Sequence, residues 1–264
     1  MFLNSKLWQG QTHYLDKMDL KELVRAYFSY PAIQVYITLA FISIGLTVYW
    51  TQAVMPVLLA FLVVPFVYAL AWFLLHRFVL HGKYLYKSAG TAKLWKRIHF
   101  DHHQDPNDLG VLFGALPTTL PTIVWISAPV GWVIAGPAGA SASLACGLIT
   151  TCVYEFCHCI QHLAYQPKLN IIKRMKKLHL AHHFHNEQGN YGIIDFFWDR
   201  VLGTYYGNTD QVPRSVTVFN LGYTGEERER FPWVGELSGP EKRVMNGSAA
   251  TGQDVRQGSS SKHE

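Results

Sequence analysis

Two long stretches without a charged side chain restrict the fold of this 264-residue chain more than any other feature. No Lys, Arg, Asp or Glu occurs between Arg25 and Arg77, and none occurs between Asp108 and Glu155. One helical crossing of a bilayer takes about 20 apolar residues, so each stretch is long enough to cross twice. We therefore expect an all-α integral membrane protein in which four transmembrane helices form two hairpins.

Short uncharged turns divide each stretch into two spans. The first stretch turns around 51–53, and the second turns around 136–139, where glycine and proline gather. Pro121 and Pro129 are expected to kink the third helix. The four expected spans cover residues 32–50, 54–75, 118–134 and 142–156.

The basic residues predict how these spans are oriented. Every Lys and Arg falls on one side of the layout, and neither far-side turn contains one. Positive residues favour the cytoplasmic face of a membrane, which places both termini there. The net charge of +5 therefore indicates a membrane face. It does not indicate a nucleic-acid partner, because the chain lacks the interleaved basic and aromatic residues of an RNA-binding surface.

Ten of the thirteen histidines gather in two windows, 76–103 and 158–183. Each window contains a pair followed by an H-x-x-H-H triplet, whose members lie about one turn apart on one helix face. Neutral imidazole is the commonest nitrogen ligand for iron, zinc and copper. The candidate metal ligands are His76, His81, His99, His102, His103, His158, His162, His179, His182 and His183.

The number and spacing of these histidines predict two metal ions in a helical cap at the cytoplasmic face. A tetrahedral zinc site takes four ligands, whereas ten imidazoles suit two metals with positions left for water or oxygen. His158 and His162 share a helix face at i and i+4. His76 and His81 are five residues apart, about 140° around a regular helix. They can share a site only if the helix ends or distorts between them.

Three carboxylates are candidates for orienting these ligands. Glu155, three residues before His158, is placed to accept the free ring N–H of a ligand histidine and so fix its tautomer. The alternative role is capping the membrane boundary. Asp101 and Asp195 are weaker candidates for the same task.

Other residues near the boxes are expected to play lesser parts. His185 lies off the ligand face and is expected beside the site or at the surface, while His13 and His263 are expected to be unrelated. Trp198 and Asn190 are candidates for shaping a substrate mouth, with packing between spans as the alternative. The four cysteines are expected to be buried, unpaired side chains.

The order of the boxes, H-x-x-x-x-H, H-x-x-H-H, H-x-x-x-H and H-x-x-H-H, resembles the fatty acid hydroxylase and sterol desaturase superfamily of membrane di-metal oxygenases. Three sequence motifs also resemble those of the family: HRFVLH, EFCHCIQH, and HHFHNEQGNYGI followed by WDRVLGT. The resemblance covers about residues 65–206. It implies that the ten histidines ligate or surround two iron ions, with zinc as an alternative occupant in purified material, and that O2 is a co-substrate.

This resemblance implies an O2-dependent di-iron lipid hydroxylase acting on a fatty acyl, sphingolipid or sterol C–H bond. Electrons would come from a separate cytochrome b5-like or ferredoxin-like partner, because the chain has no heme-binding H-P-G-G word. The expected organisation is an interfacial amphipathic segment (1–30), a membrane catalytic domain (31–236) and a disordered tail (237–264).

Several alternatives remain open at this stage. A desaturase or carotenoid hydroxylase of the same superfamily has the same boxes. The segment DPNDLGVLFGALPTT lacks the Arg-Leu-Val-Phe-Pro-Pro word of sphingolipid fatty acid 2-hydroxylases, which leaves the oxidised position open. A metal transporter would instead place histidines along a path across the bilayer. An inactive scaffold with a structural metal is a further alternative.

The compartment is also left open by the residues. The bacterial inner membrane and the endoplasmic reticulum both suit the expected layout. The bacterial membrane is favoured because the last residues contain no Lys-Asp-Glu-Leu retrieval signal.

Overall fold

The computed structural model describes residues 13–238, and this part of the chain is helical, its only β pairing being an isolated bridge between Tyr14 and Asp108. Residues 1–12 and 239–264, which include most of the predicted tail and His263, lie outside the described residues. In chain order the elements are η1 (Leu15–Lys17), α1 (Leu20–Ser29), α2 (Pro31–Trp50), α3 (Val54–Leu74), η2 (Leu75–Leu80), η3 (Leu85–Lys87), α4 (Ala89–Trp95), η4 (Lys96–Phe100), α5 (Asp101–Gln104), α6 (Leu109–Leu112), α7 (Leu116–His162), α8 (Asn170–Phe184), α9 (Phe197–Val201), η5 (Thr209–Gln211), α10 (Gly225–Arg230) and α11 (Trp233–Ser238).

Three helical segments of the described chain are long and apolar enough to cross a membrane: Pro31–Trp50, Val54–Lys87 and Leu109–His162. Apolar side chains cover their outer surfaces, as expected where a helix faces lipid. Phe41, Phe66 and Val133, for example, are 69%, 76% and 85% exposed. The first two segments confirm the expected helices and the short turn between them.

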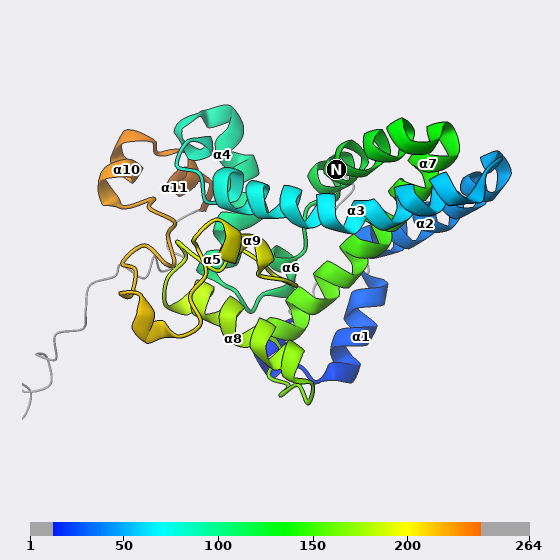
Figure 1. Cartoon of the computed structure of the whole chain (residues 1–264). Coiled ribbons are helices and arrows are strands. Elements are labelled where there is room, and N and C mark those ends of the chain that lie inside the picture. The colour runs from blue at the N-terminus through cyan, green and yellow to red at the C-terminus, as the bar shows by residue number, and fades with distance from the viewer. Residues whose placement is uncertain (1–12, 239–264) are drawn as a thin grey trace, which may run out of the picture.

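The third apolar segment folds back on itself within α7 (Figure 1). The backbone leaves the helical conformation at Ala135 and at Gly136, where φ is +55°, and Pro137 then begins the second arm. The two arms are in close contact, since a Cβ on Gly131 would lie 2.0 Å from the carbonyl oxygen of Gly139. A separate membrane crossing by each arm remains our proposal.

The predicted N-terminal amphipathic helix is present as α1, which begins with a capping box formed by Asp19 and Glu22. Its apolar face packs on the protein, where Leu23 and Tyr27 are buried in the largest core cluster. The Tyr27 hydroxyl donates to the Cys152 carbonyl of α7 at 2.6 Å. This contact fixes the helix against the bundle.

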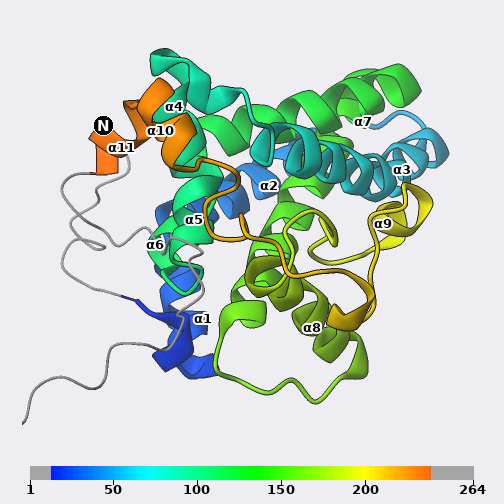
Figure 2. The ribbon, with the colours of Figure 1, turned by 90° about the vertical axis from the view of Figure 1, so that its left-hand side faces the viewer.

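The polar elements gather at one end of α2, α3 and α7 (Figure 1 and Figure 2). There α10 and α11 lie beside α4, over an aromatic cluster that includes Tyr86, Trp95 and Tyr223. The elements η2 and η4 are π-helices, in which the backbone makes wider turns than an α-helix. Both π-helices contain residues of the histidine boxes.

Residues 193–206 do not form one continuous helix, since α9 within them is only five residues long. The backbone around it is held by Asp199, whose buried carboxylate accepts from the N–H groups of Tyr191 and Gly192. Such local side-chain bonds compete with a regular helix. The segment therefore forms a loop that packs against α3 through α9.

Candidate metal centre

The ten predicted histidines form two groups of five in the structure. In each group every residue offers one ligand atom, and these atoms all lie within 4.8 Å of one another. Group one comprises His76, His81, His99, His103 and His182. Group two comprises His102, His158, His162, His179 and His183.

Each triplet is divided between the two groups. The i and i+4 members of the first triplet, His99 and His103, lie in group one, while His102 lies in group two. The second triplet does the opposite, because its i+3 member, His182, joins group one. The groups are side by side: the rings of His103 and His183 are 4.2 Å apart between centroids.

A π-helix brings the first pair together in group one. The five-residue separation of His76 and His81 matches the π-helical hydrogen bond, and the His81 N–H donates to the His76 carbonyl at 3.0 Å. Their Nε2 atoms are 3.2 Å apart, and the Nε2 of His99 lies 2.8 Å from that of His81. The expected helix distortion between the two residues is therefore confirmed.

Backbone carbonyls orient three of the rings in group one. The Nδ1 of His76 lies 2.5 Å from the Tyr191 carbonyl oxygen, that of His103 lies 2.9 Å from Val218, and that of His182 lies 2.7 Å from Gly189. A carbonyl can only accept, so each Nδ1 carries the proton and each Nε2 presents a lone pair. The Nε2 atoms of His103 and His182 have no partner among the described residues.

The rings of group two come from regular helices. His102 is on α5, while α7 and α8 each contribute two histidines at i and i+4. The Nε2 atoms of His102 and His158 are 3.1 Å apart, and those of His162 and His179 are 2.9 Å apart. No partner exists for the Nδ1 of His102, His162, His179 or His183 among the residues described.

This donor set fits a metal ion in each group. Buried lone pairs that converge repel one another unless a cation lies between them. Nitrogens bound to one ion at about 2.1 Å lie about 3 Å apart at right angles, similar to the separations found here. Burial holds the pKa of His183 well below its usual range and lowers the pKa of His182 to about 4, so both rings are neutral and available as ligands.

The three carboxylates that were candidates for orienting histidine rings bond other groups instead. Glu155 accepts from the Gly114 N–H at 3.2 Å, and Asp101 pairs with Lys96 at 2.6 Å. Asp195 accepts from the Phe197 N–H at the start of α9. In group one the orienting role belongs to main-chain oxygens, which no side-chain motif in the sequence could reveal.

The remaining candidates lie around the centre. His185 belongs to neither group, and its Nε2 lies 2.9 Å from the Val212 carbonyl oxygen. His13 also belongs to neither group. Asn190 is buried, with φ at +53°, and its side chain bonds the backbone of Tyr206.

An apolar cavity of about 500 Å3 lies between α3, α7 and the loop before α9. Phe66, Trp72, Tyr154, Ile193 and Trp198 are among its lining residues, and Asp195 is the only charged residue that lines it within residues 13–238. Trp198 thus lines a cavity, and its part in shaping a substrate mouth stays a prediction.

Two tyrosines connect this cavity to the histidines. The ring of Tyr191, on the cavity wall, lies 5.2 Å from His81 and 5.6 Å from His76 between centroids. The ring of Tyr154, on the same wall, lies 6.3 Å from His158 of group two. One tyrosine ring therefore separates the cavity from each group.

Comparison with known proteins places these features in a family. A family model described as fatty acid hydroxylase matches residues 57–204, which contain all ten histidines. The chain is 33% identical over 154 residues to a ceramide very long chain fatty acid hydroxylase of Saccharomyces cerevisiae, covering 56% of this chain and 38% of the relative. It is 33% identical over 150 residues to a dihydroceramide fatty acyl 2-hydroxylase of Arabidopsis thaliana, covering 56% of this chain and 60% of that one.

A solved structure agrees with this grouping. Full-length scs7p, of which only the hydroxylase domain is visible, matches with a TM-score of 0.55 and 28% identity over 76% of this chain and 71% of that one. A human fatty acid 2-hydroxylase is 27% identical, covering 54% of this chain and 38% of the relative. The match thus spans less than two thirds of the curated relatives.

Proposed function

The chain belongs to the fatty acid hydroxylase family, and we propose that it uses O2 to hydroxylate the acyl chain of a membrane lipid. The observation that supports this most strongly is an apolar cavity separated by single tyrosine rings from two convergent groups of five histidines. Such a cavity suits a hydrocarbon chain, and such groups suit two metal ions.

The ten histidines would hold two iron ions, whose chemistry when bound is the activation of O2 for oxidation of an unactivated C–H bond. In this reaction a C–H bond is replaced by a C–O bond, and the second oxygen atom leaves as water after two electrons and two protons are supplied. The chain contributes binding and orientation. Trp72 and Phe73 would contact the acyl chain, while Tyr154 and Tyr191 form the wall between that chain and the histidine groups.

The charge of the cavity favours a neutral lipid over a free fatty acid. Among the described residues the lining contains no Lys, Arg or His, and its one charged residue is the acidic Asp195. A fatty-acid carboxylate would be placed near a like charge in apolar surroundings, which is costly. An acyl amide has no such charge, and the names of the Saccharomyces and Arabidopsis relatives include ceramide and dihydroceramide.

The relatives' names also favour an acyl chain over a sterol or a carotenoid. Several of them are fatty acyl or fatty acid 2-hydroxylases, and we extend that position to this chain. Desaturation of the same chain is the second candidate, since removal of a second hydrogen would need the same cavity and histidines. A metal transporter is disfavoured because the histidines lie at the ends of the apolar helices or in the elements that follow them, and not along a path within those helices.

The same proposal includes a membrane arrangement and a partner. The two apolar stretches would make four crossings with the histidines at the cytoplasmic face, in a bacterial inner membrane or the endoplasmic reticulum. A separate electron donor would supply the reducing equivalents. Residues 31–236 would form the catalytic unit, with 1–30 at the interface and 237–264 as a tail.

Lipid mass spectrometry on cells with and without the full chain tests this function. We expect an N-acyl lipid that has gained the mass of one oxygen atom, and its fragments should place the oxygen on the acyl chain. The product should vanish with His182→Ala and His183→Ala and persist with the control His185→Gln, which alters a histidine outside both groups. Loss of two hydrogens would identify the desaturase, and an unchanged lipid profile would contradict the proposal.

A further inference from the structure

A segment outside the family match crosses the metal centre. The family model ends at residue 204, and the segment Ser215–Tyr223, here termed the strap, follows it by eleven residues. The strap has no histidine, cysteine or acidic residue, so no ligand motif marks it. Its contacts nevertheless reach group one.

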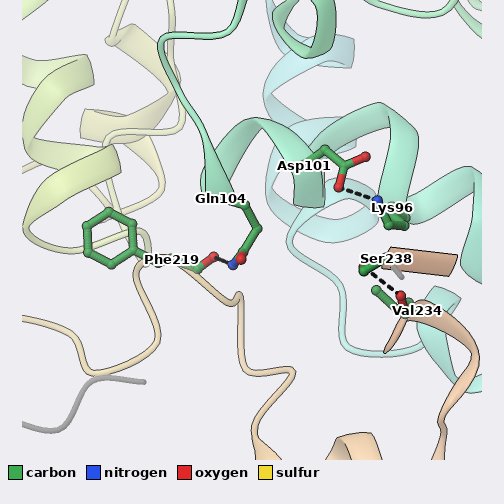
Figure 3. Close-up of polar contacts among 6 residues, drawn as sticks. All are labelled: Lys96, Asp101, Gln104, Phe219, Val234 and Ser238. Atoms are coloured by element: carbon green, nitrogen blue, oxygen red, sulfur yellow. Dashed lines mark hydrogen bonds and ion pairs between the residues drawn. The ribbon is translucent and has the colours of Figure 1, made fainter. Parts of the chain in front are cut away.

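The strap bonds two consecutive residues of α5 through its own carbonyl oxygens. Val218 accepts from the Nδ1 of His103 at 2.9 Å, and Phe219 accepts from the side-chain amide of Gln104 (Figure 3). The first bond fixes the tautomer of His103, so that its Nε2 faces the other nitrogens of group one. The second bond holds the strap beside the same helix.

The strap is held on its other side by the segment that follows the second triplet. The hydroxyl of Thr217 donates to the carboxylate of Glu187 at 2.5 Å, and the Ser215 N–H donates to the His185 carbonyl at 2.8 Å. Glu187 is only 4% exposed and comes four residues after His183. The strap therefore joins the segment after α8, which carries the second triplet, to α5, which carries His102 and His103 of the first.

Backbone strain accompanies this placement. Leu221 has a φ of +52° and the following Gly222 has a φ of +82°, and left-handed backbone is costly for a leucine. The strain is held by packing, since Leu221 and Tyr223 are buried in the cluster around Trp95. The Tyr223 hydroxyl also donates to the Phe231 carbonyl before α11.

We propose that the strap supports metal binding by group one, because it positions His103 as a ligand. This inference rests on the proposed function only in assuming that the histidine groups bind metal. His103 is the ligand, and Gln104 and Thr217 are positioning residues that act through the Val218 carbonyl. The C-terminal elements α10 and α11 then serve as the anchor of this strap.

The test is a double-mutant cycle on Zn2+ binding by the purified full-length protein in detergent. Gln104→Met removes the amide that holds Phe219, and Thr217→Val removes the hydroxyl that holds the strap to Glu187. Each variant is made in the wild-type chain and in His103→Ala. Zn2+ per chain is measured against free Zn2+ set by a chelator buffer, and thermal unfolding is recorded for every protein.

We expect each strap variant to weaken Zn2+ binding about tenfold in the wild-type chain. Loss of a group that orients a metal ligand lowers metal affinity by about 10- to 100-fold, and these variants should lie at the lower end of that range. In His103→Ala the same substitutions should change Zn2+ binding less than about twofold, because the side chain that they position is gone. Val216→Thr is the matched control, since Val216 lies in the strap but is 77% exposed. It should bind Zn2+ like the wild type.

The outcomes distinguish a failure of the strap inference from a failure of the proposed function. Equal loss in both backgrounds would make the strap a general structural support and overturn the inference, as would unchanged Zn2+ binding by both strap variants. A wild-type chain that binds no Zn2+ and no iron would instead contradict the proposed function. A strap variant that fails to fold is recognised by its unfolding curve, and the inference is then tested with the other strap variant.

Discussion

The two histidine groups have the same number of rings and similar nitrogen separations, but they are held in different ways. Group two uses regular helical spacing on α7 and α8, and most of its outer Nδ1 atoms have no partner among the described residues. Group one uses two π-helices and carbonyl oxygens from two loops. Helix geometry therefore suffices for one metal position, whereas the other depends on distant backbone.

The largest effects on metal content and activity are expected from replacing His102 or His103, two adjacent residues that belong to different groups. His102→Ala should weaken metal binding by group two, and His103→Ala should weaken metal binding by group one, although the residues are adjacent. At limiting free metal each variant should retain about half of the wild-type metal and lose hydroxylation, because the affected group keeps only four of its five ligands. Elemental analysis and the lipid assay measure the two effects. If both variants lost all metal, the groups would not be independent sites.

Asp199→Asn should weaken group one while leaving group two intact. The carboxylate accepts from the N–H groups of Tyr191 and Gly192 and from the Thr204 hydroxyl, and so places the carbonyl that orients His76. An amide can accept with only one oxygen, so unfolding should become easier by about 2 kcal/mol.

The metal affinity of group one in Asp199→Asn should fall about tenfold, as measured by chelator competition. Asp210→Asn, at an exposed position in the same region, is the control. Equal loss from both groups would show that the loop supports the whole centre and would remove the difference between them.

Gly222→Ala tests the strap with a smaller change. The residue has a φ of +82°, and a Cβ would lie 2.7 Å from the Cε of Lys83. We expect a loss of about 1 kcal/mol in the free energy of unfolding and weaker metal binding by group one. Gly225→Ala is the matched control, because a Cβ there meets no atom within 4 Å. Chemical denaturation compares the two, and equal stability would argue against a strained strap.

The smallest effect is expected from Glu155→Gln. Its carboxylate accepts from the Gly114 backbone and bonds no histidine ring among the described residues, so metal content should change by less than about twofold. The amide can accept the same bond through its oxygen. Loss of metal from group two would show that a carboxylate does orient a ring there, and the two groups would then resemble each other more closely.

The sequence predicted the parts of this structure that depend on helical periodicity. The apolar stretches indicated the helices, and the histidine spacing indicated that His158 and His162, or His179 and His183, point the same way. It also indicated that the backbone must distort between His76 and His81, as the π-helix does.

The rest depends on contacts between residues that are far apart in the chain. A triplet on one helix face gives no sign that His102 and His103 serve different groups, because the division depends on which helices pack alongside. The Val218 carbonyl is 115 residues from His103, and every residue has a carbonyl. Glu155 was a reasonable candidate by spacing, but its carboxylate is directed to Gly114.

The most direct test of the central claim is the number and ligation of metal ions in the purified full-length protein after loading with iron. Elemental analysis combined with X-ray absorption spectroscopy should give two iron ions per chain, each bound mainly by histidine nitrogen and without sulfur. A single ion per chain, or iron ligated mainly by carboxylate or sulfur, would contradict the account.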